Sequence, residues 1–243
     1  MKDIALRDLA RIGYAPVPSI AGIKEAVDFL MSRPVFVDAH VPQTARNRGD
    51  HVAIPRSAAR AAASECVCVH TDDAIVAPHL FEAALDLTDV AAAFLGRDPP
   101  ICYSANAFWT RPGPAAARPD IQGFHRDQDD ARFLAMFVYL TDVLDLEDGP
   151  HEMIGPDGLT RCVYGRAGTV FLANTSNEHR GYKPTSKERG IAWFRWGVSD
   201  RPAAGQWDNI APVSHERLGA RYPQDSRLRE SMRLLVTPPP PGS

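Results

Sequence analysis

The second half of the chain consists of short apolar runs separated by polar turns. Four runs are rich in β-branched and aromatic residues and are bounded by Gly, Pro and Asp: ICYSANAFWT (101–110), RFLAMFVYLTDV (132–143), GTVFLAN (168–174) and GIAWFRWGV (190–198). No helical pattern lies between them. RFLAMFVYL is apolar on both faces, which indicates a strand that is covered on both sides. This order predicts an antiparallel sandwich or roll with helices packed on one side.

The first hundred residues show mainly helical spacing. Residues 79–87 (HLFEAALDL) and 88–96 (TDVAAAFLG) are predicted as two helices, the second opened by Thr88 as its N-cap and closed by Gly96. Within this helical part, ECVCVH (65–70) alternates and is predicted to be a strand.

Length and composition favour one domain. The chain has 243 residues, of which 44% are hydrophobic and 23% charged. This composition excludes a disordered chain, a collagen-like repeat and a disulfide-stapled miniprotein. We expect a single domain over 1–243 with three parts: a mostly helical part (1–99), a strand-rich core (100–198), and a C-terminal helical segment with a proline-rich tail (199–243).

Charge and hydropathy limit the partners. The net charge of −3 gives no overall bias toward nucleic acid or an anionic membrane. No uncharged apolar run approaches the roughly 20 residues of a membrane helix, and the N-terminus is too charged for a signal peptide. We therefore expect a cytoplasmic protein with no nucleic-acid or membrane partner. Its four cysteines are expected to be reduced, since no CxxC pair or Cys/His cluster suggests a zinc site.

The most informative tripeptide is His125-Arg126-Asp127. Side chains two residues apart on a strand share a face, so His125 and Asp127 would present an imidazole and a carboxylate side by side. His179 follows the run 168–174 and a short polar turn. Two histidines and one carboxylate leave open positions on an octahedral ion, as in non-haem iron(II) oxygenases. The alternative for an HxD motif taken alone is an ordinary surface tripeptide.

Arg189 immediately precedes the last apolar run (190–198), ten residues after His179. A guanidinium at that point could reach into the mouth of a barrel and bind a carboxylate with two parallel hydrogen bonds. The distal carboxylate of 2-oxoglutarate is a suitable anion. The alternative is a salt bridge to a nearby acid such as Glu178 or Glu188.

Together these motifs resemble the phytanoyl-CoA dioxygenase-like family of Fe(II)/2-oxoglutarate oxygenases. The resemblance covers residues 100–198 and rests on matches in the family's order: HxD at His125 and Asp127, the strand RFLAMFVYLTDV, the turn LEDGPHEMIG (146–155), the segment AGTVFLANTSNEHRG (167–181), and Arg189. It implies a mainly β fold with flanking helices, whose core over 100–198 is a double-stranded β-helix (a cupin-like jelly roll).

The resemblance also implies a set of ligands. His125, Asp127 and His179 would hold Fe(II), Arg189 would anchor 2-oxoglutarate, and O2 would take the remaining metal position. We expect no catalytic residue beyond the metal ligands.

Three further residues are weaker candidates. Family members often place a polar side chain at the position of Asn106, near the 2-oxoglutarate C1 carboxylate or the substrate; the alternative is a backbone-bonded Asn. Arg195 shares a strand face with Arg189 and is either a second anion contact, to cosubstrate or substrate, or a rim salt bridge. His151 is expected to line the substrate mouth. The family's usual GSH after the turn is here Gly155-Pro156-Asp157-Gly158, which reshapes a loop near that mouth.

The expected activity is hydroxylation of a small metabolite or natural-product intermediate, with release of succinate and CO2. Three alternatives stay open: the same scaffold running halogenation, desaturation or cyclisation, a non-catalytic β-helix protein that binds a ligand, and a cupin-like isomerase or dioxygenase that does not use 2-oxoglutarate. The carboxylate of Asp127 argues against halogenation, because halogenating relatives have a small residue there that leaves room for chloride.

Overall fold

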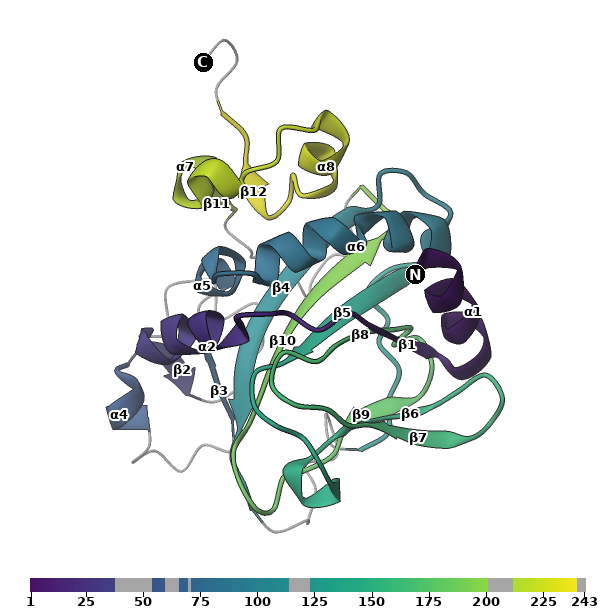
Figure 1. Cartoon of the computed structure of the whole chain (residues 1–243), viewed down its shortest axis with the longest axis vertical. Helices are drawn as coiled ribbons and strands as arrows, with labels where there is room; N and C mark the ends of the chain where they lie inside the picture. The colour runs from purple at the N-terminus through teal and green to yellow at the C-terminus, as the bar shows by residue number, and fades with distance from the viewer. Residues whose placement is uncertain (38–53, 60–65, 70, 114–122, 201–211, 240–243) are drawn as a thin grey trace.

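The computed structural model describes residues 1–37, 54–59, 66–69, 71–113, 123–200 and 212–239. Its centre is a seven-stranded antiparallel sheet (Figure 1). In spatial order the strands are β1 (Tyr14–Val17), β8 (Val170–Ala173), β5 (Phe133–Tyr139), β10 (Arg189–Gly197), β4 (Ile101–Thr110), β3 (Cys66–Val69) and β2 (Val35–Val37). All six strand pairings in this sheet run antiparallel.

A second, three-stranded sheet closes the roll. Its strands are, in spatial order, β7 (Thr160–Val163), β6 (His151–Ile154) and β9 (His179–Gly181). Side chains from both sheets meet in one apolar cluster, which includes Phe137 and Phe171 from the large sheet and Met153 and Val163 from the small one. The two sheets thus form the walls of a jelly roll with a shared interior, which confirms the predicted fold class.

Helices cover the outer face of the large sheet. The longest, α6 (Leu80–Leu95), crosses β4, β10 and β5, while α1 (Lys2–Ile12) lies beside β1 (Figure 1). The other helical segments are α2 (Ile23–Ser32), α4 (Arg56–Ala59), α5 (Thr71–Val76), α7 (His215–Leu218) and α8 (Ser226–Ser231), with 3-10 turns η1 (Leu146–Asp148) and η2 (Gly219–Arg221). A short parallel pair, β11 (Val213–Ser214) and β12 (Val236–Thr237), ties the C-terminal segment together.

Strand β5 shows why the central run is apolar on both faces. Leu134, Met136 and Val138 pack in the cluster under the helices. Phe137 and Tyr139 point the other way, into the interior of the roll. Every residue of β5 is buried, as predicted for a strand covered on both sides.

Two local predictions need correction. The described part of the first hundred residues contributes three strands to the large sheet, of which only β3 was predicted. The two helices predicted over 79–96 form one continuous helix, α6, because the segment around Leu87 and Thr88 contains no Gly or Pro that would break it. Thr88 is buried within it, and its hydroxyl donates to the Ala84 carbonyl instead of capping a helix start. Gly96 ends α6 in the left-handed conformation, as predicted.

Within the described residues, no helix is both long and apolar enough to cross a membrane.

Candidate active site

Three predicted residues come together in the interior of the roll. One ligand atom from each of His125, Asp127 and His179 lies within 4.8 Å of the others. The His125 Nε2 atom is 3.8 Å from Asp127 Oδ1, and the His179 Nε2 atom is 3.6 Å from Asp127 Oδ2. The two imidazole rings lie 4.4 Å apart between centroids. The three side chains therefore converge on one point.

Backbone pairing brings these distant residues together. The His125 amide donates to the His179 carbonyl and the His179 amide to the His125 carbonyl, both at 2.9 Å. This is an isolated antiparallel bridge, so the HxD motif does not lie in a long strand as expected. The Asp127 amide then donates to the Thr175 carbonyl at 3.0 Å. Three main-chain hydrogen bonds thus fix both halves of the cluster.

The hydrogen bonds of the imidazoles favour metal binding through Nε2. His125 Nδ1 lies 2.9 Å from the Gly123 carbonyl, and His179 Nδ1 lies 3.0 Å from the Asn177 carbonyl. A carbonyl only accepts, so each Nδ1 carries the proton and each Nε2 keeps its lone pair. Those lone pairs belong to the atoms that face Asp127. This arrangement is typical of histidines that ligate a metal.

The protonation states also suit ligation. Burial lowers the pKa of His179 to about 4, although the Asp127 charge opposes this shift. Burial by itself raises the pKa of Asp127, but the positive charge of Arg195, with His179 next, brings the pKa below its ordinary value. A neutral imidazole and an ionised carboxylate are the forms that bind metals. The residues present therefore fit a divalent first-row ion with open positions.

Arg189 lies on the inner face of the roll, at the start of β10, and is buried. Its guanidinium donates to the carbonyls of Gly149 and Tyr182 and, at 3.2 Å, to the Thr110 hydroxyl. Its Nε atom is buried without a hydrogen-bond partner. Burial lowers the pKa of Arg189. Gly181 makes room for this side chain, since a Cβ there would lie 2.9 Å from Nη2.

No described carboxylate forms an ion pair with Arg189. The alternative of a salt bridge to Glu178 is not found, because Glu178 lies 3.8 Å from Arg126 instead. A buried cation without a counter-charge is costly unless an anion binds beside it. Arg189 thus fits a site for a carboxylate ligand.

Arg195 is buried and does not lie at the rim, which corrects one of its two predicted settings. Its Nη2 is 2.8 Å from Asp127 Oδ2, and its Nη1 bonds Asp129 Oδ2. The Tyr103 hydroxyl donates to the same Asp129 oxygen at 3.0 Å. Sequence reasoning missed Asp129, although it follows Asp127 by two residues, a spacing that could have indicated it.

Asn106 lies on β4 opposite Trp193 and is buried. Its side-chain oxygen accepts the Ala107 amide at 2.8 Å. The structure therefore shows the backbone-bonded alternative for the Asn106 side-chain oxygen.

His151 is 4% exposed and lies in the interior of the roll. It begins β6, and its ring lies 5.4 Å from the His179 ring at 24°. Phe137 and Phe171 flank the same ring at 4.8 and 5.4 Å between centroids. Burial lowers the pKa of His151 well below its ordinary value, and the charges of His179 and Arg189 act in the same direction.

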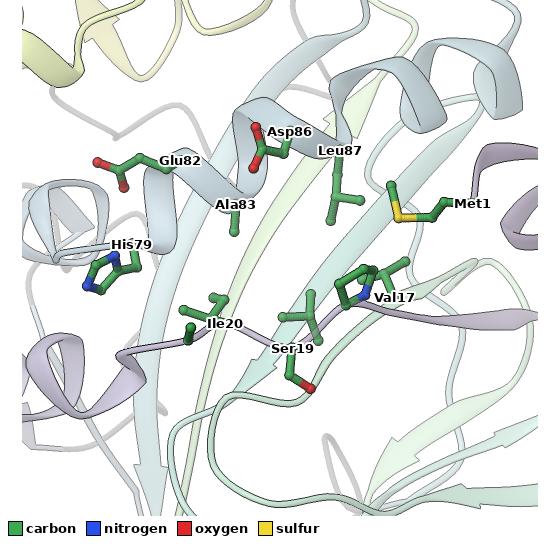
Figure 2. Close-up of a pocket in the computed structure, with 12 residues that line it drawn as sticks. Met1, Val17, Ser19, Ile20, His79, Glu82, Ala83, Asp86 and Leu87 are labelled. Atoms are coloured by element: carbon green, nitrogen blue, oxygen red, sulfur yellow. The ribbon is translucent and has the colours of Figure 1, made fainter.

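A separate hollow of about 310 Å³ lies on the helical side of the sheet, between α6 and residues 17–21 (Figure 2). Ile20 and Leu87 contribute apolar side chains to it, and Glu82 and Asp86 line it from α6. None of the predicted site residues lines this hollow. We therefore place the candidate chemistry at the His125–Asp127–His179 cluster.

No protein-family model matches the chain, and no curated protein sequence matches it. Solved structures do. AviO1 from Streptomyces viridochromogenes Tue57 is 17% identical with a TM-score of 0.55, over 84% of this chain and 98% of AviO1. HygX from Streptomyces hygroscopicus, solved with nickel, 2-oxoglutarate and hygromycin B, is 17% identical with a TM-score of 0.50, over 81% of this chain and 87% of HygX.

A third similar structure is SnoK, a non-heme alpha-ketoglutarate-dependent carbocyclase from nogalamycin biosynthesis. It is 17% identical with a TM-score of 0.51, over 84% of this chain and 93% of SnoK. At this level of identity the comparisons establish a shared fold. They agree with the jelly roll described above.

Proposed function

We propose that this chain is an Fe(II)- and 2-oxoglutarate-dependent oxygenase that acts on a small natural-product intermediate. The observation that carries the proposal is the convergence of His125 Nε2, His179 Nε2 and the Asp127 carboxylate within 4.8 Å. HygX, which has the same fold, was solved with 2-oxoglutarate and nickel bound. This likeness supports the same cosubstrate here.

His125, Asp127 and His179 would hold the iron, and Arg189 would bind the distal carboxylate of 2-oxoglutarate. Iron with 2-oxoglutarate and O2 supplies the oxidation of the second substrate, with release of succinate and CO2. The chain's own contribution is placement and exclusion of water. Phe137 stacks on Phe171 at 5.3 Å and lies 6.3 Å from Trp193 between centroids, so aromatic rings surround the interior.

The structure bears on two of the rival functions. A cupin-like enzyme without 2-oxoglutarate would leave no purpose for Arg189, a buried guanidinium on the interior face with no described carboxylate partner. A protein that only binds a ligand would not need two imidazoles, both held by backbone carbonyls with Nε2 free to ligate, beside a carboxylate. Both considerations favour the oxygenase.

Natural products are the favoured substrate class. HygX was solved with hygromycin B bound, and SnoK acts in nogalamycin biosynthesis. We propose hydroxylation as the reaction outcome. Cyclisation is the second candidate, because SnoK is a carbocyclase with this fold.

The test is formation of succinate from 2-oxoglutarate by purified protein supplied with Fe(II) and O2. We expect turnover in the wild type and none in His125→Ala, Asp127→Ala or His179→Ala, each of which should also lose most metal binding while remaining folded. His215→Ala is the matched control, because His215 lies against Tyr222 in the C-terminal segment, away from the cluster. Wild-type turnover in any one of the three site variants would refute the role of that residue.

A further inference from the structure

His151 lies between the metal-ligand cluster and Arg189. On the β6–β9 pair, Met153 is opposite His179 and His151 is opposite Gly181. Gly181 in turn packs against the Arg189 guanidinium, because a Cβ placed on Gly181 would lie 2.9 Å from Arg189 Nη2. On β6, Met153 therefore lies beside the metal-ligand candidate His179, and His151, two residues away, lies beside Gly181 and so close to Arg189. A molecule that bridges the metal and Arg189 would therefore lie near His151.

The His151 ring has one nitrogen without a partner. Its Nε2 atom is buried and makes no hydrogen bond. The rings of Phe137, Phe171 and His179 lie around the His151 ring. The backbone amide of His151 does have a partner, since it donates to the Tyr139 hydroxyl at 2.9 Å. A buried polar atom without a partner is destabilising and rare in native proteins, unless a ligand completes it.

We propose that Nε2 of His151 forms a hydrogen bond with an oxygen of bound 2-oxoglutarate. This inference rests on the proposed function, and it assigns His151 to the cosubstrate and not to the substrate mouth. The imidazole is a third polar contact, in addition to the metal and Arg189. This hydrogen bond would favour 2-oxoglutarate over an analogue that has no oxygen within reach of His151 Nε2.

Binding of 2-oxoglutarate to the Mn(II)-loaded protein, followed by calorimetry without turnover, tests the proposal. His151→Phe keeps a flat ring but removes the nitrogen, and we expect it to weaken 2-oxoglutarate binding by about tenfold or more. Mn(II) affinity should be unchanged. His151→Gln retains a donor and should recover part of the loss. Met153→Leu, on the same strand and face, is the matched control and should bind as the wild type does.

A second measurement uses the unaltered chain, in case His151→Phe does not fold. In Zn(II)-loaded protein labelled with ¹⁵N-histidine, addition of 2-oxoglutarate should shift the His151 Nε2 resonance, assigned by its loss in His151→Gln. An unshifted resonance, or a folded His151→Phe that binds 2-oxoglutarate as tightly as the wild type, would overturn the inference. Failure of the metal-loaded wild type to bind 2-oxoglutarate at all would instead refute the proposed function.

Discussion

Arg195 holds Asp127 in place: its Nη2 atom lies 2.8 Å from Asp127 Oδ2, and both side chains are largely withdrawn from solvent. The second terminal nitrogen of the guanidinium, Nη1, is bound to Asp129, which also accepts from Tyr103. The carboxylate proposed to bind metal is therefore oriented by a fixed cation. Such partners of metal ligands tune both their orientation and their charge.

Removal of Arg195 should weaken metal binding without removing any ligand. We expect Arg195→Met to lower Mn(II) affinity by about 10- to 100-fold, the usual effect of losing a partner that orients a ligand. It should also lower the free energy of unfolding by about 3–5 kcal/mol, because two buried carboxylates lose their counter-charge. Metal titration and urea unfolding measure the two effects.

Arg161→Met is the matched control for that experiment. Arg161 pairs with Asp157 at the surface, where solvent screens the two charges, so its loss should change the free energy of unfolding far less. Equal losses of stability in the two variants, or full Mn(II) affinity in Arg195→Met, would contradict the role given to Arg195.

Arg189 should govern the affinity for 2-oxoglutarate and not for metal. Charge-assisted hydrogen bonds contribute about 1.5–3 kcal/mol each, so Arg189→Ala should raise the 2-oxoglutarate dissociation constant by about ten- to a hundredfold or more. Arg189→Lys should recover only part of this loss, because an ammonium cannot make the two-pronged contact. Calorimetry on Mn(II)-loaded protein gives both affinities. An unchanged dependence on 2-oxoglutarate in Arg189→Ala would assign the role to Arg195 or another cation.

The metal-free protein should lose stability as the pH falls from about 6.5 to about 4. The pKa of His179 is 6.5 in the unfolded chain and about 4 in the fold, so over this range the unfolded state binds the proton first. One such proton lowers the free energy of unfolding by up to about 1.4 kcal/mol per pH unit. Burial also lowers the pKa of His151, which adds to the effect. Urea unfolding at several pH values should give a shallower slope for His179→Gln than for the wild type, and identical slopes would contradict the assignment.

Asp127 should direct the reaction to oxygen and away from chloride. Its carboxylate would hold the metal at the position that chloride needs, and a second anion on the same metal would be disfavoured by charge repulsion. Mass spectrometry of product made under ¹⁸O2 in high chloride should show one labelled oxygen and no chlorine. A chlorinated product from the unaltered protein would contradict this argument.

The sequence was sufficient for the features that depend on local pattern. The apolar residues of β5 were enough to predict that both of its faces are buried. The order of motifs led to His125, Asp127 and His179. The ends of α6 were also readable, although Thr88 suggested a break. A Thr can cap a helix or bond back to the preceding turn, and only its burial decides between the two.

The features that the sequence did not reveal depend on contacts between distant segments. The pairing of Arg195 with Asp127 joins residues 68 positions apart, and no periodicity encodes it. The depth of His151 follows from the register of β6 against β9, which a run of only four residues does not specify. Strand β1 was missed for a similar reason, since its four residues include Pro16.

A crystal structure of the protein with Mn(II) and 2-oxoglutarate would decide where the metal and the cosubstrate bind. We expect one manganese ion bound by His125 Nε2, His179 Nε2 and the Asp127 carboxylate, with 2-oxoglutarate on the same ion and its distal carboxylate on Arg189. Manganese bound by other residues, or a distal carboxylate on a different cation, would contradict it.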